Sequence, residues 1–124
     1  MTKENLEQRL LQLTQFWYDY VSCDHHKDRD CHFYIYKVWS YGHEPYYRIE
    51  HYGYMSELED KESYDTYAEA LYQLVKWLED EVKNVYNTVP QDWEDAKQYD
   101  YNFAGVMEVL KKHNLYPITH RKYD

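Results

Sequence analysis

Glycine and proline are scarce in this chain, with three of each among 124 residues. Long disordered linkers are rich in such residues, so a chain of this composition is not expected to contain them. The length suits a single domain spanning residues 1–124, large enough to bury an ordinary core without disulfides or metals.

Long apolar runs are also missing. No segment approaches the roughly 20 consecutive apolar residues that a membrane-spanning helix needs, and residues 1–10 are charged where a signal peptide would have an apolar core. We therefore expect a cytoplasmic protein with no membrane partner. In that compartment the only two cysteines, Cys23 and Cys31, are expected to be thiols.

The motifs of common enzyme classes are absent as well. The chain contains no G-x-S-x-G, no phosphate-binding loop, no dinucleotide-binding glycine run and no H-E-x-x-H. This weakens an enzymatic interpretation without excluding it. A binding protein is the favoured class, and we assign no catalytic residue.

Tyrosine and acidic residues are what the chain has in abundance. It carries 17 tyrosines and a formal net charge of −9. Tyrosine has a large apolar ring with a polar hydroxyl, which suits half-buried sheet faces and protein interfaces. Net negative charge repels nucleic-acid phosphates. The combination favours a protein that binds other proteins and does not contact nucleic acid directly.

Residues 1–21 are predicted to form an amphipathic helix, with Thr2 as its N-cap. Apolar residues recur at helical spacing along one stripe, namely Leu6, Leu10, Leu13, Trp17 and Val21. Leu11, Phe16 and Tyr20 lie off this stripe and widen it. A stripe of this width could face the core and also hold a second copy, so a homodimer through this helix is one open alternative.

The period then changes to two. Residues 31–39 and 46–54 alternate and are rich in aromatic side chains, and residues 40–45 have turn chemistry. The pattern predicts an antiparallel β-hairpin, possibly with a third strand. Of its two faces, the one carrying Tyr34, Tyr36, Tyr46 and Tyr52 is the candidate exposed surface, with the other face packed on helices.

The rest of the chain is predicted to be helical. Thr66 and Glu69 fit a capping box that starts a second long helix, which ends near Pro90. One or two helical turns follow over 91–98, then a last helix over 103–113. Residues 114–124 are expected to be loop-like. The order of helix, hairpin and two to three further helices predicts a compact α+β domain.

A segment of mixed ligands leaves a second alternative open. Residues 23–32 contain two thiols, three imidazoles and three carboxylates. Zinc takes tetrahedral sets of sulfur and nitrogen ligands, for which the candidates are Cys23, His25, His26, Cys31 and His32. The spacing matches no standard zinc motif, so a charged loop is the favoured interpretation and we expect no cofactor. A metal-dependent enzyme or metal-stabilised domain is the alternative.

Acidic residues cluster after the hairpin, and they suggest a partner. Glu57, Glu59, Asp60 and Glu62 lie close together, opposed only by Lys61. Such a cluster can simply keep a domain soluble, or it can steer the chain toward a basic surface. With the four tyrosines of the hairpin, these residues form the predicted partner-binding set. The leading hypothesis is a small inhibitor, of the phage anti-defence or toxin-immunity type, that docks on a basic surface of a nucleic-acid-acting protein.

Overall fold

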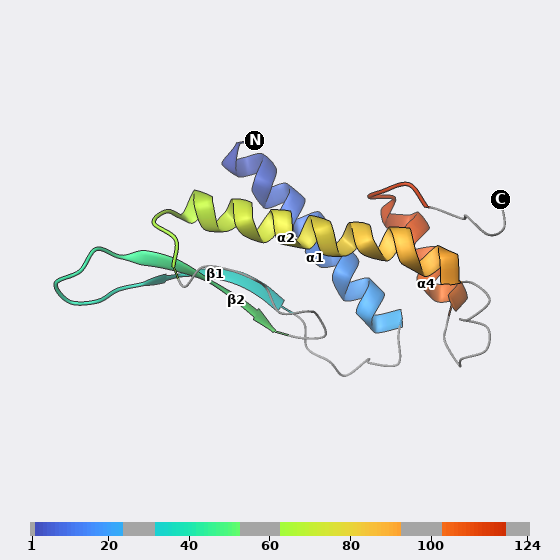
Figure 1. Cartoon of the computed structure of the whole chain (residues 1–124), viewed down its shortest axis with the longest axis horizontal. Coiled ribbons are helices and arrows are strands. Elements are labelled where there is room, and N and C mark those ends of the chain that lie inside the picture. The colour runs from blue at the N-terminus through green and yellow to red at the C-terminus, as the bar shows by residue number, and fades with distance from the viewer. Residues whose placement is uncertain (1, 24–31, 53–62, 93–102, 119–124) are drawn as a thin grey trace.

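A computed structural model of the chain describes residues 2–23, 32–52, 63–92 and 103–118 (Figure 1). Within them the order is helix α1 (Lys3–Cys23), strands β1 (His32–Val38) and β2 (Tyr46–Tyr52), helix α2 (Tyr67–Thr88), the short 3₁₀ helix η1 (Val89–Asp92) and helix α4 (Phe103–His113). The α+β prediction is thereby confirmed.

Helix α1 begins as its sequence predicts. The Thr2 hydroxyl accepts a hydrogen bond from the Asn5 backbone N–H at 3.2 Å, which satisfies one of the donors left unpaired in the first turn. Phe16 is fully buried, although it lies off the predicted stripe, whereas Leu11 remains 57% exposed. The buried stripe of this helix therefore includes Phe16 in addition to its predicted main line, but it does not include Leu11.

Strands β1 and β2 pair antiparallel, with Ile35 opposite Ile49 at the centre. The His43 N–H donates to the Ser40 carbonyl at 3.0 Å, which closes a four-residue turn. Gly42 occupies the third position of this turn with φ of +81°, the positive φ that a type II turn requires there. The predicted turn segment thus contains a turn whose geometry favours glycine.

Beyond the two strands, Tyr64 extends the sheet by a single bridge. The backbone groups of Tyr47 and Tyr64 exchange two hydrogen bonds, both 2.8 Å long. No third strand is present among the described residues, and residues 53 and 54, predicted to end the second strand, lie outside them.

Helix α2 is the central packing element. Its N-cap Thr66 accepts a hydrogen bond from the Glu69 N–H at 3.2 Å, as one half of the predicted capping box. It packs against α1 and against both strands of the hairpin, and Figure 1 shows α1 crossing it. The sequence predicts that one face of the hairpin packs on helices, and the main helical contact is with α2. Its buried residues are Ala70, Leu71, Leu74, Val75, Leu78, Val82, Val85 and Tyr86.

Helix α4 packs against α1 and adds its own buried side chains to the core. It ends at His113, as predicted, with Asn114 at φ of +49° after its last turn. The buried Tyr86 of α2 donates its hydroxyl to the Leu110 carbonyl at 2.7 Å and accepts from the Leu115 N–H at 3.3 Å. One side chain therefore holds the end of α4 and the chain that follows against α2. Residues 114–118 have no regular secondary structure, and no helix in the described part of the chain is long and apolar enough to cross a membrane.

The hairpin turn gives a first prediction. An alanine Cβ at Gly42 would meet no atom within 4 Å, so Gly42→Ala should cost only the backbone energy of positive φ, about 1 kcal/mol. Gly42→Asn should cost less, because asparagine tolerates this region. Hydrogen exchange of the β1 amides measures the loss. Equal protection in the alanine variant and the wild type would contradict the turn geometry.

Tyr86 gives a second prediction, with a pH dependence. Tyr86→Phe should lower the unfolding free energy by about 1 kcal/mol at neutral pH, because a buried hydrogen bond is lost. Burial raises the pKa of the Tyr86 hydroxyl. The folded state therefore keeps this proton at a pH where the unfolded state releases it, and wild-type stability should fall as pH rises above about 10.

Because the phenylalanine variant lacks this titration, the stability difference between the two proteins should shrink in alkaline solution. Denaturant titrations at neutral and alkaline pH measure it. Tyr72→Phe, at an exposed position of the same helix, is the matched control and should leave stability unchanged. A Tyr86→Phe variant as stable as the wild type at neutral pH would contradict the assignment.

Candidate functional site: an aromatic hairpin

The two faces of the hairpin have different surroundings. The alternation of side chains places Phe33, Ile35 and Ile49 on one face, where Ile49 is buried and the other two pack against the core. Tyr34, Tyr36 and Tyr46 fall on the opposite face, directed away from α2. The sequence predicted this division of the two faces.

The structure describes only part of the predicted partner-binding set. Tyr34 is 49% exposed, while Tyr36 and Tyr46 are half-buried. The rings of Tyr34 and Tyr36 lie 6.1 Å apart at their centres, within the range of favourable aromatic pairs. For Tyr52 the structure describes only the backbone, at the end of β2. Four acidic residues of the set lie outside the described residues, namely Glu57, Glu59, Asp60 and Glu62.

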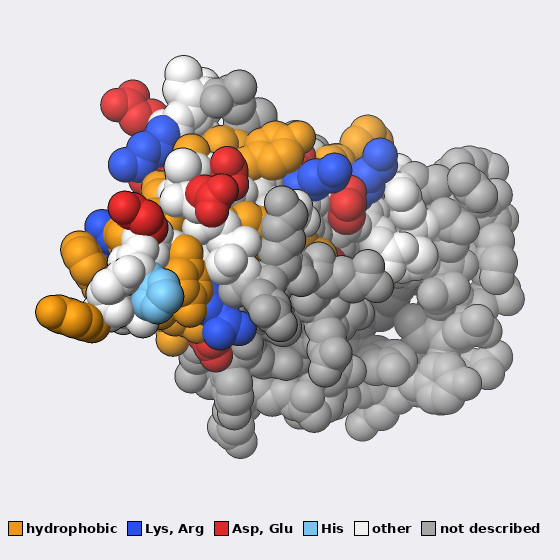
Figure 2. Space-filling model, turned by 60° about the vertical axis from the view of Figure 1, so that its left-hand side comes forward, with side chains coloured by type: hydrophobic (Ala, Val, Ile, Leu, Met, Phe, Trp, Pro, Cys, Tyr) orange, Lys and Arg blue, Asp and Glu red, His pale blue; other side chains and the backbone are white. Residues whose placement is uncertain are grey.

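The turn end of the hairpin, residues 39–45, carries the most exposed rings of the described part of the chain; we call it the hairpin tip. Trp39 is 73% exposed and Tyr41 is fully exposed. Figure 1 shows the tip extending beyond the helices, and Figure 2 shows hydrophobic side chains standing out among charges of both signs. Large exposed rings on a projecting element contribute little to folding stability, because they bury little area within the chain itself. Such rings therefore suggest a role in binding.

Lys37 contacts two aromatic rings at the base of the tip. The Lys37 ammonium group lies 4.2 Å from the centre of the Trp39 ring and 5.9 Å from that of Tyr47. Both distances are within the roughly 6 Å over which a cation is attracted to a ring face. Lys37 therefore favours one placement of Trp39, which lowers the entropy lost when that ring is buried by a partner.

Sequence reasoning did not include Trp39 and Tyr41 in the site. The sequence pattern places Trp39 at the end of a strand and Tyr41 in a turn. Only the projection of the hairpin past the helices makes them prominent. The available signal was compositional: two large rings within or beside a turn, where small polar residues are the usual occupants.

The predicted metal ligands are only partly described. Cys23 ends α1 and His32 begins β1, so the backbone is described at both ends of the segment. His25, His26 and Cys31 lie between them, outside the described residues. Within the described part of the chain, no group of three or more His, Cys, Asp or Glu residues could hold a metal ion.

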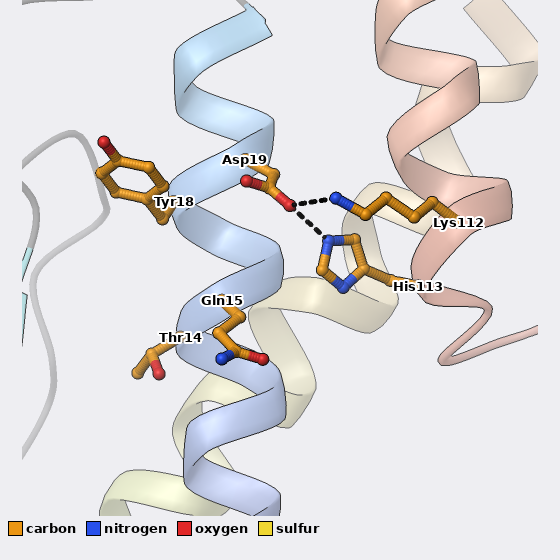
Figure 3. Close-up of a pocket in the computed structure, with 6 residues that line it drawn as sticks. All are labelled: Thr14, Gln15, Tyr18, Asp19, Lys112 and His113. Atoms are coloured by element: carbon orange, nitrogen blue, oxygen red, sulfur yellow. Dashed lines mark hydrogen bonds and ion pairs between the residues drawn. The ribbon is translucent and has the colours of Figure 1, made fainter.

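A second feature is a cleft between α1 and α4, which the sequence pattern does not indicate. Asp19 of α1 points toward the last turn of α4 across a cleft of about 470 Å³ (Figure 3). One oxygen of its carboxylate lies 2.7 Å from His113 Nε2 and 3.4 Å from Lys112 Nζ. Asp19 and His113 are 94 positions apart, so no local spacing could signal the contact.

The charged side chains at this cleft connect α1 to α4. Acid–base catalysis on a substrate would need a nucleophile or a substrate-binding donor beside the Asp19–His113 pair. The Thr14 and Ser22 hydroxyls donate within their own helix, Thr14 to the Leu11 carbonyl at 3.0 Å and Ser22 to that of Tyr18 at 2.8 Å. The Asp19–His113 pair joins α1 to α4, and the hairpin, with its exposed rings, is the stronger candidate.

Comparisons with known proteins add no identification. No family model matches the chain, and searches of curated proteins and of solved structures found no similar protein.

The tip rings give a third prediction. Trp39→Ala and Tyr41→Ala should each change the unfolding free energy by less than about 0.5 kcal/mol, because exposed side chains contribute little to stability. Phe16→Ala, at a fully buried position, is the contrasting control and should cost about 3–5 kcal/mol. Denaturant unfolding measures all three. A loss above about 1 kcal/mol at Tyr41 would show that the tip serves the fold.

Proposed function

We propose that this protein is a small acidic binding module that inserts the hairpin tip into another protein and acts as its inhibitor. The observation that carries the proposal is the pair of exposed rings, Trp39 and Tyr41, on an element that projects from the helical body. Tryptophan and tyrosine are enriched among the few interface residues that carry most of the binding energy.

Charge supports a partner with a basic surface. The chain has a net charge of −9, so its long-range field attracts positive surfaces and repels phosphates. The described hairpin itself is balanced, with Lys37 and Arg48 against Glu44 and Glu50. The rings at the tip therefore supply the close contacts, while acidic residues elsewhere on the chain steer the encounter.

The class of partner follows from this charge. Proteins that act on nucleic acids present basic channels to phosphates, and an acidic protein can occupy such a channel in place of the nucleic acid. An inhibitor of the anti-defence or toxin-immunity type has this profile. The predicted acidic set Glu57, Glu59, Asp60 and Glu62 is the candidate steering group of the same proposal.

A fourth prediction tests the proposal by site-specific crosslinking in the cells that express the protein. A photoreactive benzoylphenylalanine replaces Tyr41 in one variant and Tyr18 in the control. Tyr18 is also exposed, at 65%, but lines the cleft between α1 and α4. The expected result is one basic, nucleic-acid-acting protein crosslinked from position 41 and not from position 18. The same crosslinked proteins from both positions would contradict docking through the tip.

With that partner purified, the two roles can be measured separately. Trp39→Ala or Tyr41→Ala should accelerate dissociation by about 30-fold, since anchor rings contribute about 2 kcal/mol or more. Reversing the four acidic residues to lysine should instead slow association at low salt. Unchanged kinetics in every variant would exclude both the anchoring and the steering roles.

A further inference from the structure

The outer edge of β1 has backbone groups available for pairing. In an antiparallel ladder, alternate residue pairs direct their N–H and C=O groups toward each other, and the pairs between them direct these groups outward. Tyr47 uses its backbone groups to bind Tyr64, so the pair Lys37–Tyr47 is one of the outward pairs. By alternation, Phe33, Ile35 and Lys37 direct their N–H and C=O groups away from β2.

The two edges of the hairpin are therefore not equivalent. The edge of β2 is bridged by Tyr64, whereas no segment among the described residues pairs with the edge of β1. Natural edge strands are commonly protected by proline, a bulge or several charged side chains. Strand β1, with the sequence HFYIYKV, contains no proline, and its pairing with β2 is continuous without a bulge.

We propose that β1 pairs antiparallel with the β1 of a second copy of this chain, which joins two hairpins into one four-stranded sheet. The outward residues 33, 35 and 37 are spaced evenly about Ile35, the midpoint of the strand. A two-fold axis at Ile35 places Phe33 opposite Lys37 of the second copy, and Ile35 opposite itself. All the outward backbone groups of both strands then find partners.

The side chains agree with this register. On the face away from α2, the axis places Tyr34 opposite Tyr36 of the second copy, which makes two cross-strand ring pairs, a favourable combination. On the other face Lys37 lies beside a phenylalanine ring, and the two lysines are at opposite ends of the pairing. A register centred on Lys37 would set the two ammonium groups directly opposite each other. Phe33 and Ile35, half-buried in one copy, would gain cover.

The dimer leaves the hairpin tips accessible. Because the two β1 strands run in opposite directions, the tips lie at opposite ends of the four-stranded sheet. This pairing does not depend on the proposed inhibitory function, and it uses the strand edge where that function uses the tip.

Charge-swap variants test the register. Tyr34→Glu/Tyr36→Glu and Tyr34→Lys/Tyr36→Lys each place like charges opposite each other across the axis, so each should raise the dimer dissociation constant by about tenfold or more. Mixed together, the two should form a heterodimer, which controls for misfolding. Tyr34→Lys/Tyr36→Glu should remain a dimer by itself, since position 34 faces position 36 of the second copy. Native mass spectrometry and light scattering measure the species.

Each other outcome overturns the proposal. A wild type that stays monomeric at about 100 µM, well above ordinary dimer dissociation constants, excludes self-pairing. A dimer that both like-charge variants leave intact and that Leu11→Glu abolishes assigns association to α1. A mixture of the two like-charge variants that stays monomeric, with both folded by circular dichroism, excludes this register. A monomer whose β1 amides become protected only with another protein bound assigns the edge to that protein.

Discussion

Burial of the apolar side of α2 is the constraint on which the rest of the structure depends. A two-stranded hairpin is marginally stable by itself, and here α2 packs on the strands, where Ile49 is buried. The same helix also packs against α1 and reaches α4 through Tyr86. Removing large side chains from α2, such as Leu74 or Leu78, would therefore leave cavities in the core, because both are fully buried.

Tyrosine fills very different environments within this fold because its ring and hydroxyl can be used independently. In Tyr86 both are used inside the core, where the ring packs on Phe16 at 5.4 Å and the hydroxyl bonds to the backbone. Tyr116 lies at the margin of the core, where its hydroxyl accepts from Arg9 at 3.1 Å. At Tyr41 neither group has a described partner, and the ring is fully exposed. One residue type thus serves both in a largely aliphatic core and at the candidate interface.

Local patterns predicted the local structure well. The caps Thr2 and Thr66 act through side chains three residues from their targets, and the end of α4 follows from a short periodic run. The alternation in β1 and β2 predicted which side chains face α2, because period-two patterns leave only two choices of face.

Features that depend on three-dimensional arrangement were beyond such patterns. That α2 rather than α1 covers the strands depends on how the helices pack against each other. The contact between Asp19 and His113 joins distant positions through the crossing of α1 and α4. The prominence of Trp39 and Tyr41 requires knowing how far the hairpin extends past the helices, and the sequence holds no signal for that length. The predicted metal ligands and acidic set lie largely in segments for which the structure describes no side chains.

The separation between tip and core also bears on how this protein can change over generations. Residues 39–44 are all exposed, so selection for a folded chain acts weakly on them, apart from Gly42, whose positive φ favours glycine. Substitutions there alter what the hairpin can recognise while α1, α2 and α4 keep the same packing. A lineage under pressure from a changing target could therefore vary this short segment rapidly, or replace it with another sequence of similar length, without first acquiring mutations that stabilise the fold.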